Sequence, residues 1–243
     1  FNANHVKYSL GLLALGVPIA YFVMMFRDRE LAPQEHSRIQ AFVWIFIGAT
    51  LFWMIYDQAG SVLTLFTEKK VDRDLGFLTI PTAWFQSINS AFILLLAPLF
   101  AWMWIRMGSR QPGTPQKFSW AIIGVGLSFI IMAVAGSLAA KGLISAWWII
   151  LVYLVQTIAE LLLSPVGLSA TTKLAPLRYA SQVMGLWFLA TAAGNALNIW
   201  IAPLSKQFSD VVYYGTIGGI AVVMGFAFWM GAKAIQRLMA GVH

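Results

Sequence analysis

Long apolar runs dominate the chain, and short polar segments separate them. A helix that crosses a membrane needs roughly 20 mostly apolar residues to cover about 30 Å of hydrocarbon. Seven runs qualify, and charged residues, Pro or Gly mark their ends. The seven runs are residues 8–26, 39–66, 80–105, 118–140, 146–172, 180–204 and 212–232. None shows the strict alternation, over about ten residues, of a membrane β-strand. The pattern therefore predicts an all-α, polytopic membrane protein.

The composition supports this fold class and excludes several others. Of the 243 residues, 60% are hydrophobic and 10% are charged, whereas soluble domains are about 25% charged. The net charge of +7 comes from Lys and Arg spread through short loops, so we expect no nucleic-acid partner. The chain has no cysteine, which excludes disulfides, thiolate metal sites and Cys nucleophiles. It begins at Phe1 with no Met and no signal-peptide pattern, so we expect a piece of a longer protein.

The basic residues of the loops predict the orientation in the membrane. Ten Lys and Arg lie in the loops 27–38, 106–117 and 173–179 and in the tail from Lys233. Six lie on the other side, at the N-terminus and in the remaining loops. Since cytoplasmic loops carry the excess of Lys and Arg, we expect the C-terminus to be cytoplasmic.

Two acidic residues, Asp57 and Glu160, lie inside long apolar runs, while the other seven lie in predicted loops. A charged carboxylate at the bilayer centre costs roughly 2.5–3.5 kcal/mol. No Lys or Arg lies deep in a run, so the positive partner must be a proton, a ligand amine or a basic residue outside this chain. The simpler alternative is a protonated acid that is hydrogen-bonded in a packed bundle.

Both acids belong to polar stripes, whose residues recur at steps of three and four and so share a helical face. A polar cluster also opens the run 80–105. The stripes are Thr50, Trp53, Asp57, Ser61 and Thr64; Tyr153, Thr157, Glu160, Ser164, Gly167 and Thr171; and Met184, Trp187, Thr191, Asn195 and Asn198; the cluster is Gln86, Ser87, Asn89 and Ser90. Small residues in such stripes are typical of helix packing. Acids, amides and indoles together favour a wet cavity.

The runs 118–140 and 212–232 contain no charged residue, so we expect them to be scaffold helices. With the first run set aside, two cavity helices and one scaffold helix occur twice in succession. This order is typical of a six-helix unit built from two three-helix repeats. Within the last run, Gly215 and Gly219 form a GxxxG pattern, which predicts a packing face.

Four segments resemble the proton-dependent oligopeptide transporter family of the major facilitator superfamily. They are FWMIYDQAGS at 52–61, IPTAWFQSINS at 80–90, QTIAELLLSPVGLSATTKLAP at 156–176 and MGLWFLATAAGN at 184–195. The resemblance runs from about residue 37 to 205 and is to the C-terminal six helices of that twelve-helix fold. It implies a C-terminal six-helix bundle over residues 37–243. Residues 1–36 would hold the extra linker helix of prokaryotic members and a cytoplasmic connection.

The resemblance also implies roles for single residues. Glu160 matches the acid that receives the amino terminus of a peptide, and Asn89 matches an amide that bonds the peptide backbone. Asp57, where many members have Glu, matches an acid proposed to act in gating and proton coupling. Four further residues match pocket positions: Trp53, Ser164, Trp187 and Thr191, the last in place of a Ser in many members.

The implied function is proton-coupled symport of di- and tripeptides by alternating access, in the plasma (inner) membrane of a prokaryote. The partners would be peptide, protons, the lipid bilayer and an N-terminal six-helix half, with no cofactor or metal. A carrier of nitrate, amino acids or another small solute on the same fold is the alternative. A channel is disfavoured because the stripes differ from one another. An enzyme is disfavoured because no HExxH, GxSxG or paired intramembrane Asp motif occurs.

Overall fold

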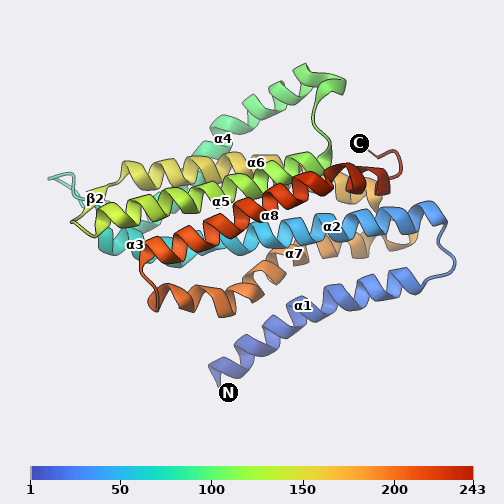
Figure 1. The fold of residues 1–243 in the computed structure, drawn as a ribbon, viewed down its shortest axis with the longest axis horizontal. Helices are drawn as coiled ribbons and strands as arrows, with labels where there is room; N and C mark the ends of the chain where they lie inside the picture. The colour runs from blue at the N-terminus through green and yellow to red at the C-terminus, as the bar shows by residue number, and fades with distance from the viewer. Residues whose placement is uncertain (1, 243) are drawn as a thin grey trace.

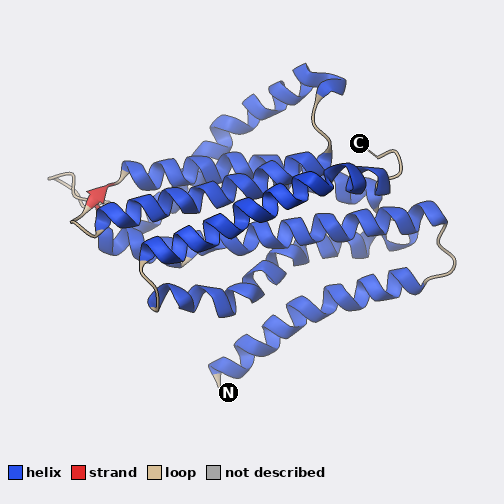
Figure 2. Cartoon of the chain, in the orientation of Figure 1, coloured by secondary structure: helices blue, strands red, loops and turns tan. Residues whose placement is uncertain are grey.

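The structure, a computed structural model, describes residues 2–242, without the side chains of residues 3 and 4. It is a bundle of long helices with one very short pair of strands (Figures 1 and 2). The helices are α1 (Ala3–Arg27), α2 (Pro33–Tyr56), α3 (Val62–Lys70), α4 (Thr82–Met107), α5 (Thr114–Ala139), α6 (Trp147–Leu174), α7 (Ala180–Ile201) and α8 (Asp210–Leu238). Within the described residues, seven helical segments are long and apolar enough to cross a membrane. The seven predicted spans are therefore confirmed.

The span predicted at 39–66 is not one continuous helix. It consists of α2 and α3, which a 3-10 turn at Asp57–Gly60 separates. Ser61 then leaves the helical conformation, with φ −131° and ψ −83°. Since a 3-10 turn has 3.0 residues per turn rather than 3.6, the face that carries Trp53 does not continue through Thr64. The hydroxyl of Thr64 instead donates to the carbonyl of Ala59 at 2.8 Å.

The two scaffold helices, α5 and α8, pack against each other along most of their length, and α5 also lies along α6 (Figure 1). Glycines permit this approach, because a Cβ at Gly126 would lie 2.9 Å from the carbonyl oxygen of Gly218. The prediction that Gly215 and Gly219 form the packing face is wrong, because the close approach is made at Gly218. A Cβ at Gly215 would make only an ordinary contact, and Gly219 has nothing within 4 Å. Helix α8 approaches the backbone of α5 closely at Gly218, one residue before Gly219.

A second close approach joins α2 to α7 at Gly194. A Cβ there would lie 2.7 Å from the backbone nitrogen of Met54 and 2.8 Å from the carbonyl oxygen of Thr50. Both atoms belong to the backbone of α2, so no side-chain rotation can relieve the contact. Gly194 thus sets the distance between the two helices that carry Asp57 and Thr191.

We expect Gly194→Ala to destabilise the protein by about 1–3 kcal/mol, because the extra methyl group overpacks the α2–α7 contact. The midpoint of thermal unfolding in detergent measures this loss. Gly185 lies on the same helix with nothing within 4 Å of an added Cβ, so Gly185→Ala is the matched control. Alanine favours a helix over glycine by about 1 kcal/mol, and the control should be neutral or stabilising. Equal midpoints for the two variants would contradict the close contact.

One end of the bundle is fastened by contacts that the sequence did not reveal. Strands β1 (Val71–Asp72) and β2 (Ile144–Ser145) pair in parallel and join the loops after α3 and α5. Beside them, Lys70 at the end of α3 forms an ion pair with Asp210 at the start of α8. These contacts hold α3 to the scaffold helices at the end that we predict to be extracellular.

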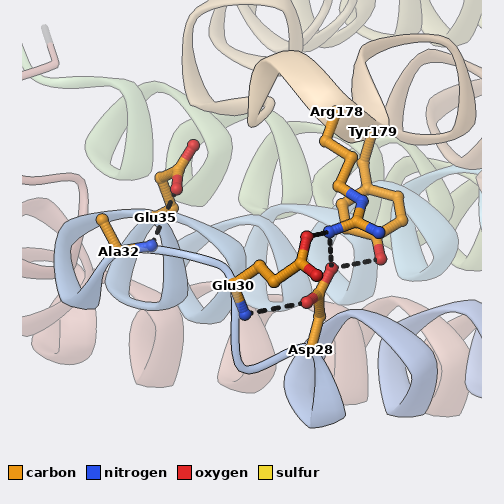
Figure 3. A network of polar contacts seen from close by, with 6 residues as sticks. All are labelled: Asp28, Glu30, Ala32, Glu35, Arg178 and Tyr179. Atoms are coloured by element: carbon orange, nitrogen blue, oxygen red, sulfur yellow. Dashed lines mark hydrogen bonds and ion pairs between the residues drawn. The ribbon is translucent and has the colours of Figure 1, made fainter.

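At the opposite end, a polar cluster fastens the connection between α1 and α2 to the start of α7 (Figure 3). Arg178 forms ion pairs with Asp28 and Glu30, and the Tyr179 hydroxyl donates to Asp28 at 2.6 Å. The hydrogen bonds from Tyr179 and from the Glu30 backbone N–H, with the charge of Arg178, lower the pKa of Asp28 below its ordinary value. Helix α1 itself lies mainly along α7, and the division of the chain at residue 36 stays a prediction.

Candidate functional site

Glu160 lies in the middle of α6, and its carboxylate is reached from two other helices. The hydroxyl of Tyr56, at the end of α2, donates to Glu160 Oε2 at 2.6 Å. The side-chain amide of Asn89 on α4 donates to the same oxygen at 3.3 Å. The Thr157 hydroxyl, one turn before Glu160, donates to Asn89 Oδ1 at 2.6 Å and so fixes the orientation of the amide. The structure therefore brings Glu160 and Asn89 together, while their roles in binding substrate stay predictions.

The hydrogen bonds to Glu160 do not neutralise its charge. The ion pairs found among residues 2–242 use Lys70 and Arg178, at the ends of helices, and neither reaches Glu160 or Asp57. Among the described residues, both hydrogen bonds to Glu160 are made to one oxygen, Oε2. A half-buried carboxylate with neutral donors on one oxygen is suited to bind a cation or a proton at the other.

Asp57 begins the 3-10 turn between α2 and α3 and faces α7. The side-chain amide of Asn195 donates to Asp57 Oδ2 at 2.7 Å. The next residue, Gln58, is buried and held from two sides. It accepts from the Tyr213 hydroxyl at 2.6 Å and donates to Asn198 Oδ1 at 3.2 Å. The break in the helix thus places one carboxylate and one amide against α7 and α8.

The predicted pocket residues take different positions. Trp53 is half-buried and packs edge-on against the ring of Tyr56, with centroids 5.2 Å apart. The Oγ of Ser164, one turn beyond Glu160, is buried and has no hydrogen-bond partner among the described residues. Thr191 is half-buried on α7. These three residues lie on α2, α6 and α7, respectively, and their pocket roles stay predictions.

Trp187 is almost fully buried, whereas a residue in a pocket wall would be partly exposed. Its exposed fraction is 6%, and its ring packs edge-on against Phe118 at a centroid distance of 6.3 Å. A Cβ at Gly167 would lie 2.0 Å from Trp187 Cη2. The indole therefore fills the space that Gly167 leaves on α6. The sequence-based role of Gly167 as a packing residue agrees with this contact, while the pocket role of Trp187 stays a prediction.

Tyr56 and Gln58 are site residues that the sequence reasoning missed. Tyr56 does not belong to the polar stripe that contains Asp57. It is the last residue of α2, and this position at the helix end lets its hydroxyl reach Glu160. Gln58 faces inward because the 3-10 turn rotates the chain. The sequence did contain a signal for both residues, because Tyr56, Asp57 and Gln58 form three consecutive polar residues inside an apolar run.

Comparison with known proteins gives a consistent result. The chain matches the POT family over residues 2–222. It is 41% identical to a Bacillus subtilis protein described as an uncharacterized transporter, over 96% of this chain and 47% of that protein. It is 37% identical to a di-/tripeptide transporter of Lactococcus lactis, over 99% of this chain and 49% of the relative. The chain thus spans about half the length of the curated relatives that it matches.

Solved structures give the same match. The crystal structure of a peptide transporter POT in complex with sulfate has a TM-score of 0.93 and 41% identity, over 99% of this chain and 49% of that one. A POT family transporter in complex with 5-aminolevulinic acid has a TM-score of 0.91 and 33% identity, over 97% of this chain and 49% of that one. Both matches cover nearly the whole chain, and so include α1 as well as the six membrane-length segments that follow it.

Proposed function

Since the chain belongs to the POT family, we propose that it forms one half of a proton-coupled symporter of di- and tripeptides. The observation that carries the proposal is the state of Glu160 within a helical span. Its carboxylate accepts hydrogen bonds from neutral side chains, and no described basic residue forms an ion pair with it. A peptide ammonium is the kind of cation that such a group binds by charge-assisted hydrogen bonds. Relatives named as di-/tripeptide transporters support the choice of substrate.

The other site residues have proposed roles around this anchor. Asn89, held by Thr157, would bond the peptide backbone. Trp53, Ser164, Trp187 and Thr191 would shape the pocket, with the unpaired hydroxyl of Ser164 as a further donor or acceptor. Asp57 would bind and release the transported proton. Its hydrogen bond from Asn195 supports this role, because an amide stabilises the carboxylate without fixing its protonation state.

The alternative solutes fit the site less well. Nitrate is an anion, which the carboxylates Glu160 and Asp57 would repel. A free amino acid has the ammonium but lacks a peptide bond for Asn89. The 5-aminolevulinic acid bound by one solved relative agrees with this argument, because a ketone lies between its amine and its carboxylate, as the amide carbonyl does in a dipeptide.

The facing half of the pocket is proposed to lie on an N-terminal six-helix bundle of the same protein. Helix α4, which carries Asn89, presents large apolar side chains outward, with Leu94, Leu95 and Ile105 exposed by 77%, 71% and 81%. A facing bundle and lipid together would cover this surface. The same bundle would supply the Lys or Arg that binds the peptide carboxylate, which this half lacks near Glu160. The C-terminus would lie in the cytoplasm, as the loop charges predict.

Reconstitution of the separate halves tests whether both halves are needed for transport. We expect residues 1–243 alone to give no accumulation of a labelled dipeptide in proteoliposomes, because alternating access requires one bundle to move against another. Co-expression with the N-terminal half should restore uptake. A co-expressed half carrying Glu160→Gln is the matched control and should restore little. Robust proton-driven uptake by residues 1–243 alone would contradict the proposal.

A further inference from the structure

A cavity of about 840 Å³ lies at the end of the bundle that we predict to be cytoplasmic, away from Glu160 and Asp57. Its walls include the C-terminal end of α4, which diverges from α6 in Figure 1, the loop that follows α4 and the start of α5. The ends of α6 and α8 complete its walls. None of the site residues discussed above lines it.

The charge of this cavity has one sign. Lys117, Lys173 and Lys233 line it, from α5, α6 and α8 respectively, and none of the described lining residues is acidic. The N-terminal turn of α5, from Gly113 to Gln116, also faces it. A helix N-terminus carries a partial positive charge. The formal charges of the side chains that line the cavity therefore favour an anion.

Lys117 is the residue that points most clearly to a ligand. It is buried, with an exposed fraction of 7%, and its Nζ donates to Gln111 Oε1 at 2.7 Å. Nζ also lies 4.1 Å from the centroid of the Trp104 ring. Neither contact neutralises the ammonium, although burial of an uncompensated cation is costly. The Trp104 ring, against which Lys117 packs, belongs to a residue that lines the same cavity.

The position of the cavity indicates the source of the anion. It lies at the ends of membrane-length helices, and near the end of α4 the Arg106 guanidinium lies 5.4 Å from the centroid of the Trp102 ring. Trp and basic residues at helix ends mark the depth of the lipid headgroups. The cytoplasmic leaflet carries anionic lipids, and basic pockets between helices on that side bind their headgroups. Apolar wall residues such as Pro165 and Val166 suit the first methylene groups of the acyl chains of such a lipid.

We propose that this cavity binds a phosphate group, held by Lys117, Lys173 and Lys233. The phosphate comes from an anionic phospholipid headgroup or from free phosphate, and the location favours the headgroup. This inference does not depend on peptide transport. The bound phosphate would stabilise the cytoplasmic ends of α5, α6 and α8 against one another.

Native mass spectrometry of the complete protein with added phosphatidylglycerol or phosphatidylcholine tests the site. We expect preferential retention of phosphatidylglycerol, and about fivefold weaker binding for each lysine replaced by glutamine. Lys117→Gln removes the buried charge, and Lys233→Gln removes one from an exposed helix position that folding tolerates. Lys141→Gln, an exposed lysine at the other end of the bundle, is the matched control and should leave binding unchanged.

Thermal unfolding with added inorganic phosphate distinguishes the two sources. Stabilisation of the parent protein by phosphate, lost in Lys117→Gln and Lys233→Gln, would support a site for free phosphate. Lysine-dependent retention of phosphatidylglycerol without a phosphate effect would support the headgroup. Equal binding of the two lipids with no phosphate effect, or equal effects of Lys233→Gln and Lys141→Gln, would overturn the proposal. Release of the bound lipid by dipeptide would also overturn it, since the cavity would then belong to the peptide path.

Discussion

Replacement of Glu160 by Gln is expected to lower dipeptide affinity by roughly 10- to 150-fold, which corresponds to the loss of one charge-assisted hydrogen bond of about 1.5–3 kcal/mol. Gln preserves the size of the side chain and can still accept from Tyr56 and Asn89. The change therefore removes the charge and little else. Binding of a labelled dipeptide to the complete protein in detergent measures the loss.

Two variants separate this effect from indirect ones. Glu68→Gln removes an exposed acid at the end of α3 and should leave dipeptide affinity unchanged. Tyr56→Phe removes the donor 2.6 Å from Glu160 but keeps the carboxylate, so affinity should fall far less than in Glu160→Gln. Unchanged affinity in Glu160→Gln would show that the peptide ammonium binds elsewhere.

Asp57→Asn is expected to abolish gradient-driven accumulation of dipeptide while exchange of peptide across the membrane continues. The reason is that Asn cannot take up and release a proton in place of the carboxylate. Its side-chain oxygen can still accept from Asn195, as Asp57 does at 2.7 Å, so the contact with α7 survives. Paired assays of driven uptake and of counterflow exchange in proteoliposomes measure the two activities separately.

Asp74→Asn provides the control for this variant, because Asp74 is an exposed loop acid that accepts from the Gly76 N–H. Both activities should survive in it. If driven uptake and exchange fall together in Asp57→Asn, the carboxylate either binds peptide directly or is needed for folding, and the coupling role is wrong.

The fold could be predicted from the sequence because hydrophobic length is a strong signal in membrane proteins. Seven apolar runs became seven membrane-length helical segments. The break at Asp57 was missed because long apolar runs lie on both sides of it and no proline marks it, and Gly60 and Ser61 were the local signal. Close helix contacts were also hidden. The pattern around Gly215 and Gly219 indicated a packing face, but which glycine meets a neighbour depends on where the helices cross.

In the candidate site too, the sequence predicted features within one helix but not contacts between helices. The periodicity of α6 placed Glu160 and Ser164 on one face, and the structure keeps them one turn apart. The bond from Tyr56 to Glu160 joins residues 104 positions apart in the chain, and helix periodicity does not report such pairs. The resemblance to a family supplied Asn89, and the structure adds its hydrogen bonds to Glu160 and Thr157.

Uptake of a labelled dipeptide by proteoliposomes that contain the complete protein tests the central claim most directly. With an inward proton gradient, we predict accumulation above the external concentration. A protonophore should abolish it, an excess of unlabelled dipeptide should compete with it, and nitrate or free amino acids should not. Accumulation that is insensitive to the protonophore, or that nitrate or a free amino acid suppresses as well as dipeptide does, would contradict proton-coupled peptide transport by this protein.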